Sequence, residues 1–205
     1  MIFGILLPAL LLAATPPPDA SALIARLKRP VPASTAYTEV RFVHQLTRPL
    51  VLRGELDYGG ADKLGKRVDV PYREVTSICG GAVTVTRADR SPRHFDLERA
   101  PELKALMGGF SALLGGDASA LATLYTIVLV DNGNDWTLTL VPRDAVLAGH
   151  LRDFVIDGTD AEPRCFTLHQ GNGDASVMLL GALAAAKLPQ PPSVAALATL
   201  CRAEP

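Results

Sequence analysis

The amino-acid sequence predicts an α+β fold, mainly antiparallel β, in which an unclosed half β-barrel is covered by a helical lid over an internal hydrophobic cavity. Three observations predict it. Apolar and polar residues alternate, with short turns between the runs, from Thr38 to Arg87 and again from Thr126 to Leu180. Between these blocks, Pro101 to Tyr125 has helical spacing. A sheet of about nine to eleven strands tends to curl, so the helices must cover one of its faces.

Length and composition limit the possible functions. A chain of 205 residues forms one large domain or two small ones and can bury a substantial core. Apolar residues make up 48% of it, so we expect it to fold. Lys and Arg number 20, and Asp and Glu 21. Because binding to nucleic-acid phosphates requires a basic surplus, this near balance argues against a nucleic-acid partner. We also expect a monomer.

The N-terminus resembles a signal peptide. Ile2 to Ala14 is almost entirely apolar and uncharged, and it is shorter than the roughly 20 residues that span a bilayer. Leu12-Ala13-Ala14 is an acceptable cleavage site, followed by three prolines. We predict a signal peptide over residues 1–14, extending to residue 20 at most, with an uncleaved anchor as the alternative. No cysteine follows the apolar run, so a lipid anchor is not expected.

A short helix and a hairpin come next. Asp19 or Ser21 can cap the helix, and Pro30 ends it. Its apolar face holds Leu23, Ile24 and Leu27. In the first strand of the hairpin, the apolar side holds Val40, Phe42 and Leu46, with His44 among them, and the polar side holds Glu39, Arg41 and Gln45. In the second strand, the apolar side holds Leu50, Leu52, Leu56 and Tyr58, and the polar side holds Arg53, Glu55 and Asp57. We expect the apolar sides to face inward.

The remaining strands are predicted from similar runs of apolar residues separated by turns. In the first block they cover Leu64 to Val70, Arg73 to Cys79 and Ala82 to Arg87, with Gly80-Gly81 as a turn. In the second block they cover residues 126–130, 136–140, 151–157, 164–169 and 176–180. Pro189, Pro191 and Pro192 lead to a small helix near Ser193 to Arg202.

The helical block predicts the lid. Its apolar set is Leu103, Leu106, Met107, Phe110, Leu113 and Leu114. We expect the pairs Gly108-Gly109 and Gly115-Gly116 to divide it into short pieces that can shift, with Asp117 as the cap of the third.

Three cysteines leave the disulfide pattern open. In an oxidising compartment one pair of Cys79, Cys165 and Cys201 could bridge, and the alternative is three buried thiols. The candidate pair is Cys79 with Cys165, which would close a long loop worth about 4 kcal/mol in the chain-entropy model. No two cysteines lie close together, so we expect no zinc site.

The polar constellations of an enzyme are missing. Around Ser111, GFSAL lacks the closing glycine of a nucleophile elbow. Cys165 and His169 would lie about 13 Å apart along a strand, and DNGND at 131–135 has Trp136 where a calcium loop needs glycine. The four histidines, His44, His94, His150 and His169, are scattered. We therefore expect no catalytic residue, metal or cofactor.

The notable feature of the sequence is instead the apolar faces of the predicted strands and lid. A half-barrel under a shifting lid is a natural place for a pocket, and methionine adapts to irregular ligands. The candidate lining residues from the strands are Val40, Phe42, Leu52, Leu56, Tyr58, Ile78, Val85, Trp136, Leu138 and Leu140. Those from the lid are Leu106, Met107, Phe110 and Leu114.

The order of these parts resembles the outer-membrane lipoprotein carrier LolA and its wider superfamily with LolB and RseB. The residues that carry the resemblance are Phe42 with Gln45, Gly54 to Tyr58, Val70-Pro71, Ile78 to Val85 and Trp136 to Pro142. It runs from Asp19 to Leu183, which we take as the domain at 19–183, followed by a Pro-rich tail at 184–205 with a short helix. An arginine that holds the lid closed in the carrier has no counterpart near Gly60.

The resemblance implies a periplasmic carrier or chaperone that shelters acyl chains in its cavity. Such carriers take a lipidated protein or lipophilic molecule from an inner-membrane transporter and pass it to an outer-membrane receptor. One alternative is a periplasmic sensor or regulatory module of the same fold. Another is an enzyme acting on lipid substrates, for which His44, His169 and Cys165 would be the residues to test.

Overall fold

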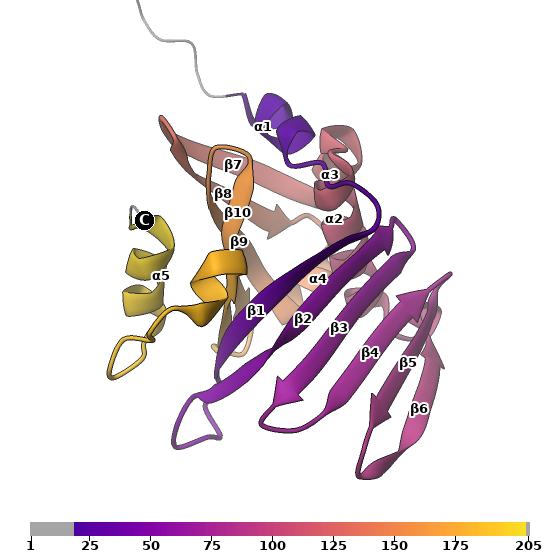
Figure 1. Cartoon of the computed structure of the whole chain (residues 1–205). Helices are drawn as coiled ribbons and strands as arrows, with labels where there is room; N and C mark the ends of the chain where they lie inside the picture. The colour runs from indigo at the N-terminus through magenta and orange to yellow at the C-terminus, as the bar shows by residue number, and fades with distance from the viewer. Residues whose placement is uncertain (1–18, 204–205) are drawn as a thin grey trace, which may run out of the picture.

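The computed structural model describes residues 19–203, so the predicted signal peptide at 1–14 lies outside it. Within this part, eleven antiparallel strands form one sheet in the order β6-β5-β4-β3-β2-β1-β11-β10-β9-β8-β7. Pairing of β1 with β11 joins the two sequence blocks, whereas β6 and β7 are the two free edges (Figure 1). The sheet is therefore curved but unclosed, and the predicted fold class is confirmed.

The strands of the first block are β1 (Ala33–Phe42), β2 (Leu50–Gly60), β3 (Lys63–Val70), β4 (Glu74–Cys79), β5 (Ala82–Arg87) and β6 (Arg90–Asp96). Those of the second block are β7 (Tyr125–Asn132), β8 (Asp135–Pro142), β9 (Leu151–Thr159), β10 (Glu162–Gln170) and β11 (Ala175–Leu180). The sequence did not indicate β6, because this edge strand is polar and largely exposed and contains Pro92, which suits an edge.

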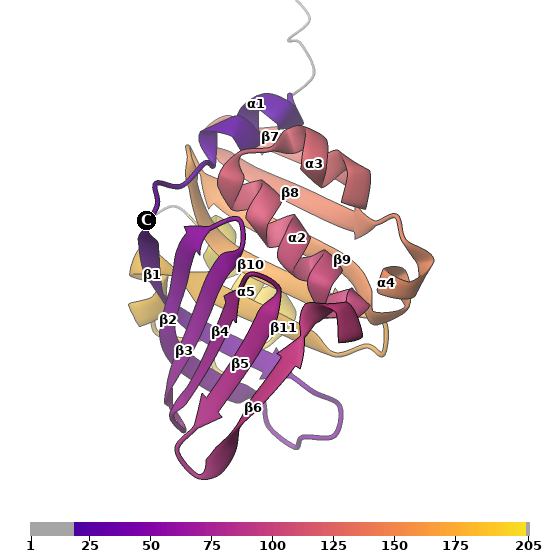
Figure 2. The ribbon, with the colours of Figure 1, turned by 90° about the vertical axis from the view of Figure 1, so that its right-hand side faces the viewer.

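The α-helices are α1 (Ala20–Arg26), α2 (Pro101–Gly115), α3 (Ala118–Leu124), α4 (Ala145–His150) and α5 (Val194–Arg202). Two short 3₁₀ helices are η1 (Leu97–Arg99) and η2 (Gly181–Ala185). In Figure 2, α2 crosses in front of the sheet and α5 lies behind it. None of the helices in the described residues is long and apolar enough to cross a membrane.

The lid is more continuous than the sequence suggests. α2 passes through Gly108 and Gly109 without a break, which corrects the prediction that both glycine pairs divide it. A Cβ on Gly109 would lie 2.7 Å from Cε2 of Tyr125, so this glycine permits a close crossing. The second pair does end the helix, because Gly116 takes a left-handed conformation with φ of 72°.

Replacing Gly109 with alanine is therefore expected to lower the free energy of unfolding by about 1–3 kcal/mol, since the added methyl group collides with the Tyr125 ring. Gly108 is the matched control: a Cβ there meets only Leu124 Cδ1, at an ordinary 3.5 Å. Gly108→Ala should gain up to about 1 kcal/mol from helix propensity. Denaturant unfolding compares the two variants, and equal effects would contradict the packing role of Gly109.

The disulfide differs from the candidate pair. Cys165 on β10 is bonded to Cys201 on α5, whereas Cys79 is exposed and free, so the Cys79–Cys165 pairing is wrong. Cys79 ends β4 on the outer side of the sheet, while Cys165 points into the space beneath α5. Fully buried Val40, Val177 and Leu197 surround the bond. It fixes the C-terminal helix on the convex face.

The facing of β1 is the reverse of the expected one. Val40 lies on the convex face, fully buried under α5, and Phe42 packs against the same cluster. Glu39 and Arg41, expected outward, lie on the concave face with Leu52 and Leu50, their register partners on β2. Both faces of β1 are buried from Tyr37 to Val40, so an apolar residue there does not mark the inner side. The strand also ends at Phe42, which leaves Leu46 exposed.

Candidate functional site

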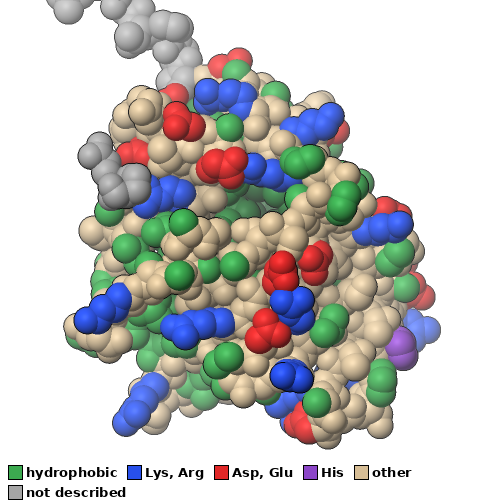
Figure 3. Space-filling model, viewed as in Figure 1, with side chains coloured by type: hydrophobic (Ala, Val, Ile, Leu, Met, Phe, Trp, Pro, Cys, Tyr) green, Lys and Arg blue, Asp and Glu red, His purple; other side chains and the backbone are tan. Residues whose placement is uncertain are grey.

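A cavity of about 610 Å³ lies between α2 and the concave face of the sheet. Its apolar lining from the strands consists of Ala33, Leu56, Tyr58, Leu64, Ile78, Pro163, Phe166, Leu168, Met178 and Leu180. From α2 come Leu103, Leu106, Met107, Phe110 and Leu114. Figure 3 shows a hollow with hydrophobic side chains in it below α1, with acidic and basic side chains at its upper rim.

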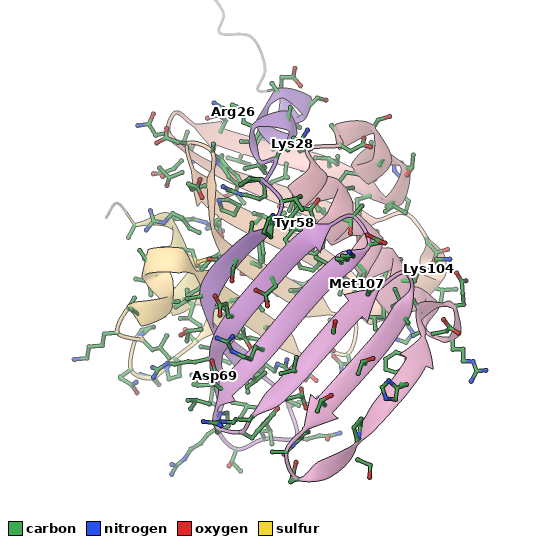
Figure 4. All side chains as sticks on the ribbon, turned by 45° about the vertical axis from the view of Figure 1, so that its right-hand side comes forward. Arg26, Lys28, Tyr58, Asp69, Lys104 and Met107 are labelled. Carbon is green, nitrogen blue, oxygen red and sulfur yellow. A yellow bond between two sulfur atoms is a disulfide. The ribbon has the colours of Figure 1, made fainter. Side chains whose placement is uncertain are left out.

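Strand pairing produces the apolar floor. Directly opposed residues of antiparallel neighbours share a face. One row therefore runs across four strands from Ala33 through Tyr58 and Leu64 to Ile78. Figure 4 shows Tyr58 on β2 and Met107 on the lid helix behind the strands. The cavity thus lies where rows of the sheet and one face of α2 oppose each other.

Aromatic packing holds the lid helix on the second block. The ring of Phe110 lies 4.8 Å from that of Phe154 and 5.5 Å from that of Phe166, between centroids. Ser111 acts as an ordinary helix residue, whose hydroxyl donates to the Ala61 carbonyl at 2.6 Å. These contacts join α2 to both halves of the sheet.

The predicted lining residues fall into four places. Those that line the cavity are Leu56, Tyr58, Ile78, Leu106, Met107, Phe110 and Leu114. Those buried in the main core outside the cavity lining are Leu52, Trp136, Leu138 and Leu140. Val85 packs in a smaller cluster around Ile78, Val83 and Leu97. Val40 and Phe42 lie on the opposite face and do not line the cavity.

Trp136 illustrates why a core position was mistaken for a lining one. Its ring lies on Gly158, where a Cβ would come within 2.1 Å of it. Its indole nitrogen donates to the Asp160 carbonyl at 3.0 Å. The missing side chain of Gly158 creates the space that Trp136 fills. From the alternation of β8 alone, a core side chain and a cavity side chain look identical.

The sequence reasoning missed a charged cluster in the cavity, formed by Glu39, Arg41, Lys66 and Ser176. Arg41 donates to Glu39 through Nε at 2.8 Å and Nη2 at 3.2 Å. Lys66 Nζ donates to the same carboxylate, as does Ser176 Oγ at 2.6 Å. All four residues line the cavity. The sequence held a clue to this cluster. Glu39 and Arg41 lie two and four residues after Tyr37, so all three side chains share one face of β1.

This cluster determines the ionisation of Glu39. The side chain of Glu39 is only 5% exposed, and burial by itself would raise its pKa. The hydrogen bond from Arg41 and the charge of Lys66 outweigh burial and lower the pKa of Glu39 to about 2. Burial has the opposite effect on the amine, because it lowers the pKa of Lys66 despite the nearby Glu39 carboxylate. Glu39 is thus a buried carboxylate anion.

An arginine also bridges the other end of the cavity. Arg29 follows α1, and its guanidinium bonds Glu162 Oε1 at 2.7 Å and the Ala161 carbonyl at 2.8 Å. Its backbone N–H donates to the Leu114 carbonyl at 2.8 Å, near the end of α2. Residues 57–63, around Gly60, contain no arginine, and Arg29 connects the lid to the sheet from a different segment.

The polar residues that the sequence offered as catalytic candidates are bonded to other residues of the fold. Cys165 is in the disulfide, so the Cys165–His169 pair has no thiol. His169 bonds Asp153, and His44 bonds Asp174 at 2.8 Å. The pKa of Asp174 is lowered by its hydrogen bonds from His44. Within residues 19–203, no group of three or more His, Cys, Asp or Glu residues is placed to hold a metal ion.

Comparison with protein families agrees with this architecture. The family model described as "Outer membrane lipoprotein carrier protein LolA-like" matches residues 13–204. The chain belongs to the LolA-like family. The search of curated proteins found no match for this LolA-like chain.

Solved structures similar to this LolA-like protein are distant in sequence. A LolA superfamily protein from Nitrosomonas europaea has 12% identity and a TM-score of 0.43, with 83% of this chain and 93% of that chain covered. LprF from Mycobacterium bovis has 10% identity and a TM-score of 0.39, with 88% of this chain and 100% of that chain covered. The family assignment rests on the family model.

Proposed function

We propose that this LolA-like protein is a periplasmic carrier, which binds the acyl chains of a lipidated protein or a lipid-like envelope component and moves it between the inner and outer membranes. The observation that carries the proposal is the cavity of about 610 Å³ under α2, whose lining is mostly apolar. Its volume falls within the range of about 300–1,000 Å³ common for ligand sites. The family description supports the same class of cargo.

Affinity in such a site would come from burial of apolar surface, at about 25 cal/mol per Å² removed from water. The lid helix α2 is held by a few separate contacts, each of which can open without breaking the others. They are the Phe110 packing, the Ser111 bond to Ala61 and the Arg29 bridge to Glu162. A carrier needs such a lid because cargo must enter and leave within its working cycle.

Two features support the proposed location. The predicted signal peptide would direct the chain across the inner membrane. The Cys165–Cys201 disulfide requires an oxidising compartment, and the bacterial periplasm is one. An inner-membrane transporter that loads the carrier and an outer-membrane receptor that unloads it are the proposed partners.

Native mass spectrometry of the chain, purified from a periplasmic extract of its own host without detergent, tests the carrier function directly. We expect a discrete added mass that organic solvent removes and whose fragments identify the cargo. In parallel, the stripped protein should bind a fluorescent fatty acid. A bare chain that also binds no fatty acid would contradict the proposal.

Replacing Phe110 with aspartate is expected to abolish uptake of the fluorescent fatty acid. A carboxylate at this position would point into the apolar cavity and repel an acyl chain. Val146→Asp is the matched control, because Val146 is 60% exposed on α4, away from the cavity. Circular dichroism checks folding, and Met107→Asp repeats the test without disturbing the aromatic packing. Full uptake by both folded lid variants would refute the assignment of α2 to the binding site.

A further inference from the structure

The charged cluster lies in the wall of the cavity, where an ordinary hydrophobic core would have apolar side chains. Glu39, Arg41 and Lys66 lie on the concave face, among the residues that line the cavity. Along β1, Glu39 is six residues from Ala33, which corresponds to roughly 20 Å of strand. Arg29 and Glu162, which form an ion pair, also line the cavity, as does Ala33. The mostly apolar lining therefore contains the Glu39 cluster and, separately, the Arg29–Glu162 pair.

Two cations share one carboxylate in the cluster. Arg41 and Lys66 are two cations on the single Glu39 carboxylate. Glu74 on β4 is a further anion that acts on Lys66, because its register partner Arg87 pairs with Asp89 instead. Asp69 is bonded to Arg67, which also pairs with Glu55 on the outer side. Within residues 19–203, Glu39 is thus the one anion in an ion pair with either cation, and Glu74 acts on Lys66 without forming such a pair.

Exposure shows which groups face the empty space. The side chain of Glu39 is 5% exposed, whereas that of Lys66 is 26% and that of Arg41 is 38% exposed. The carboxylate therefore lies beneath the two cations and holds them in place. Lys66 Nζ also lies 5.0 Å from the centroid of the Tyr37 ring. This arrangement orients two cationic groups toward the cavity before any ligand arrives.

Both cations keep unused hydrogen-bond donors. An ammonium has three N–H donors and a guanidinium has five. Within residues 19–203, the only recorded acceptor for either side chain is the Glu39 carboxylate. Carboxylate and phosphate oxygens form the strongest hydrogen bonds with such groups. The free donors, the two cationic groups and the adjoining apolar lining all fit one type of molecule.

We propose that Lys66 and Arg41 form a headgroup subsite, and that the cargo is an amphiphile whose single anionic group, a carboxylate or a phosphodiester, binds there while its acyl chain lies under α2. This inference rests on the proposed carrier function. It adds a requirement that an apolar cavity alone would not impose, because neutral and anionic lipids with the same chain should bind differently.

Displacement of the neutral probe N-phenylnaphthylamine from the stripped protein measures the difference. Oleate is compared with oleyl alcohol, and phosphatidylglycerol with the diacylglycerol of the same chains. We expect each anionic lipid to bind about tenfold more tightly than its neutral partner, the gain of one hydrogen bond to a charged group. The pair with the larger ratio identifies whether a carboxylate or a phosphodiester is preferred.

Lys66→Met should remove most of this ratio by weakening the binding of the anionic lipids. Lys63→Met is the matched control, since Lys63 is exposed on the same strand and does not line the cavity. Arg41→Gln provides a second test if Lys66→Met folds poorly. Equal binding of anionic and neutral lipids would overturn the headgroup subsite while acyl binding stands. If the stripped wild-type protein binds none of the four lipids, the carrier function itself fails and the subsite with it.

Discussion

Replacing Glu39 with glutamine is expected to lower the free energy of unfolding at pH 7 by about 3 kcal/mol. The neutral amide keeps the shape of the side chain but leaves Arg41 and Lys66 without their shared anion. Two cations then repel each other at a largely buried position. Urea unfolding at pH 7, with the midpoint and slope compared between wild type and variant, measures the loss.

The pH dependence of this loss has a definite sign. The pKa of Glu39 is lowered from 4.5 to about 2 in the folded protein, so folding favours the ionised carboxylate. Its contribution is fully present above pH 4.5 and is lost as the pH falls towards 2. The difference between wild type and Glu39→Gln should therefore shrink across this window. A difference that stays constant from pH 5 to pH 2.5 would contradict the ion-paired state of Glu39.

A carboxylate on the outer face provides the control. Glu55 has the same kinds of partner as Glu39, since it bonds Arg67 and the Ser34 hydroxyl, but it lies in contact with water. Water screens an exposed ion pair, so Glu55→Gln should change stability much less than Glu39→Gln. Similar losses from the two substitutions would show that burial does not set the strength of the Glu39 cluster.

Strand positions were predictable because burial on one face leaves a period of two in the sequence. Leu52, Leu56 and Tyr58 on β2 face the concave side as expected, opposite exposed residues such as Arg53 and Asp57. Where one face of a strand contacts water, the alternation identifies both the strand and its orientation. The overall class of fold followed from repeated segments of this kind around one helical block.

The orientation of β1 was not predictable by the same reasoning. Val40 is buried under α5, which begins at Val194, more than 150 positions later in the chain. The other face carries Glu39, which is buried because three donors satisfy it. Alternation reflects the contrast between water and protein, and the middle of β1, from Tyr37 to Val40, is buried on both faces and has no such contrast. Only the tertiary partners decide which of its faces lines the cavity.

Glycines in the lid were ambiguous for a related reason. A glycine pair inside a helix can mark a break or a close contact, and the sequence does not distinguish them. Gly109 is required by the approach of Tyr125, whereas Gly116 is required by its backbone conformation. The candidate site was therefore predicted in its lid and in part of its strand lining, but its charged end depended on contacts between distant segments.

Replacing Cys201 with serine is expected to lower the free energy of unfolding by about 3–4 kcal/mol in the chain-entropy model of a crosslink. The bond joins residues 36 positions apart and closes a loop that contains β11, η2 and the proline-rich segment. Without it, the unfolded chain regains the freedom of this loop. Guanidinium unfolding of the oxidised wild type and of Cys201→Ser measures the loss. Cys79→Ser is the control, because Cys79 is exposed and unpaired.

Loss of the crosslink should also weaken contacts that depend on α5. Arg202 on this helix bonds Asp157 at 2.9 Å, and the Asp157 side chain is only 2% exposed. Val40 on β1 is fully buried against the same helix. If α5 separates from the sheet, Asp157 and Val40 both meet water, and amide exchange should rise in β10 and β11 before it rises in β2 and β3. Uniform exchange across the sheet would show that the disulfide acts on the unfolded chain alone.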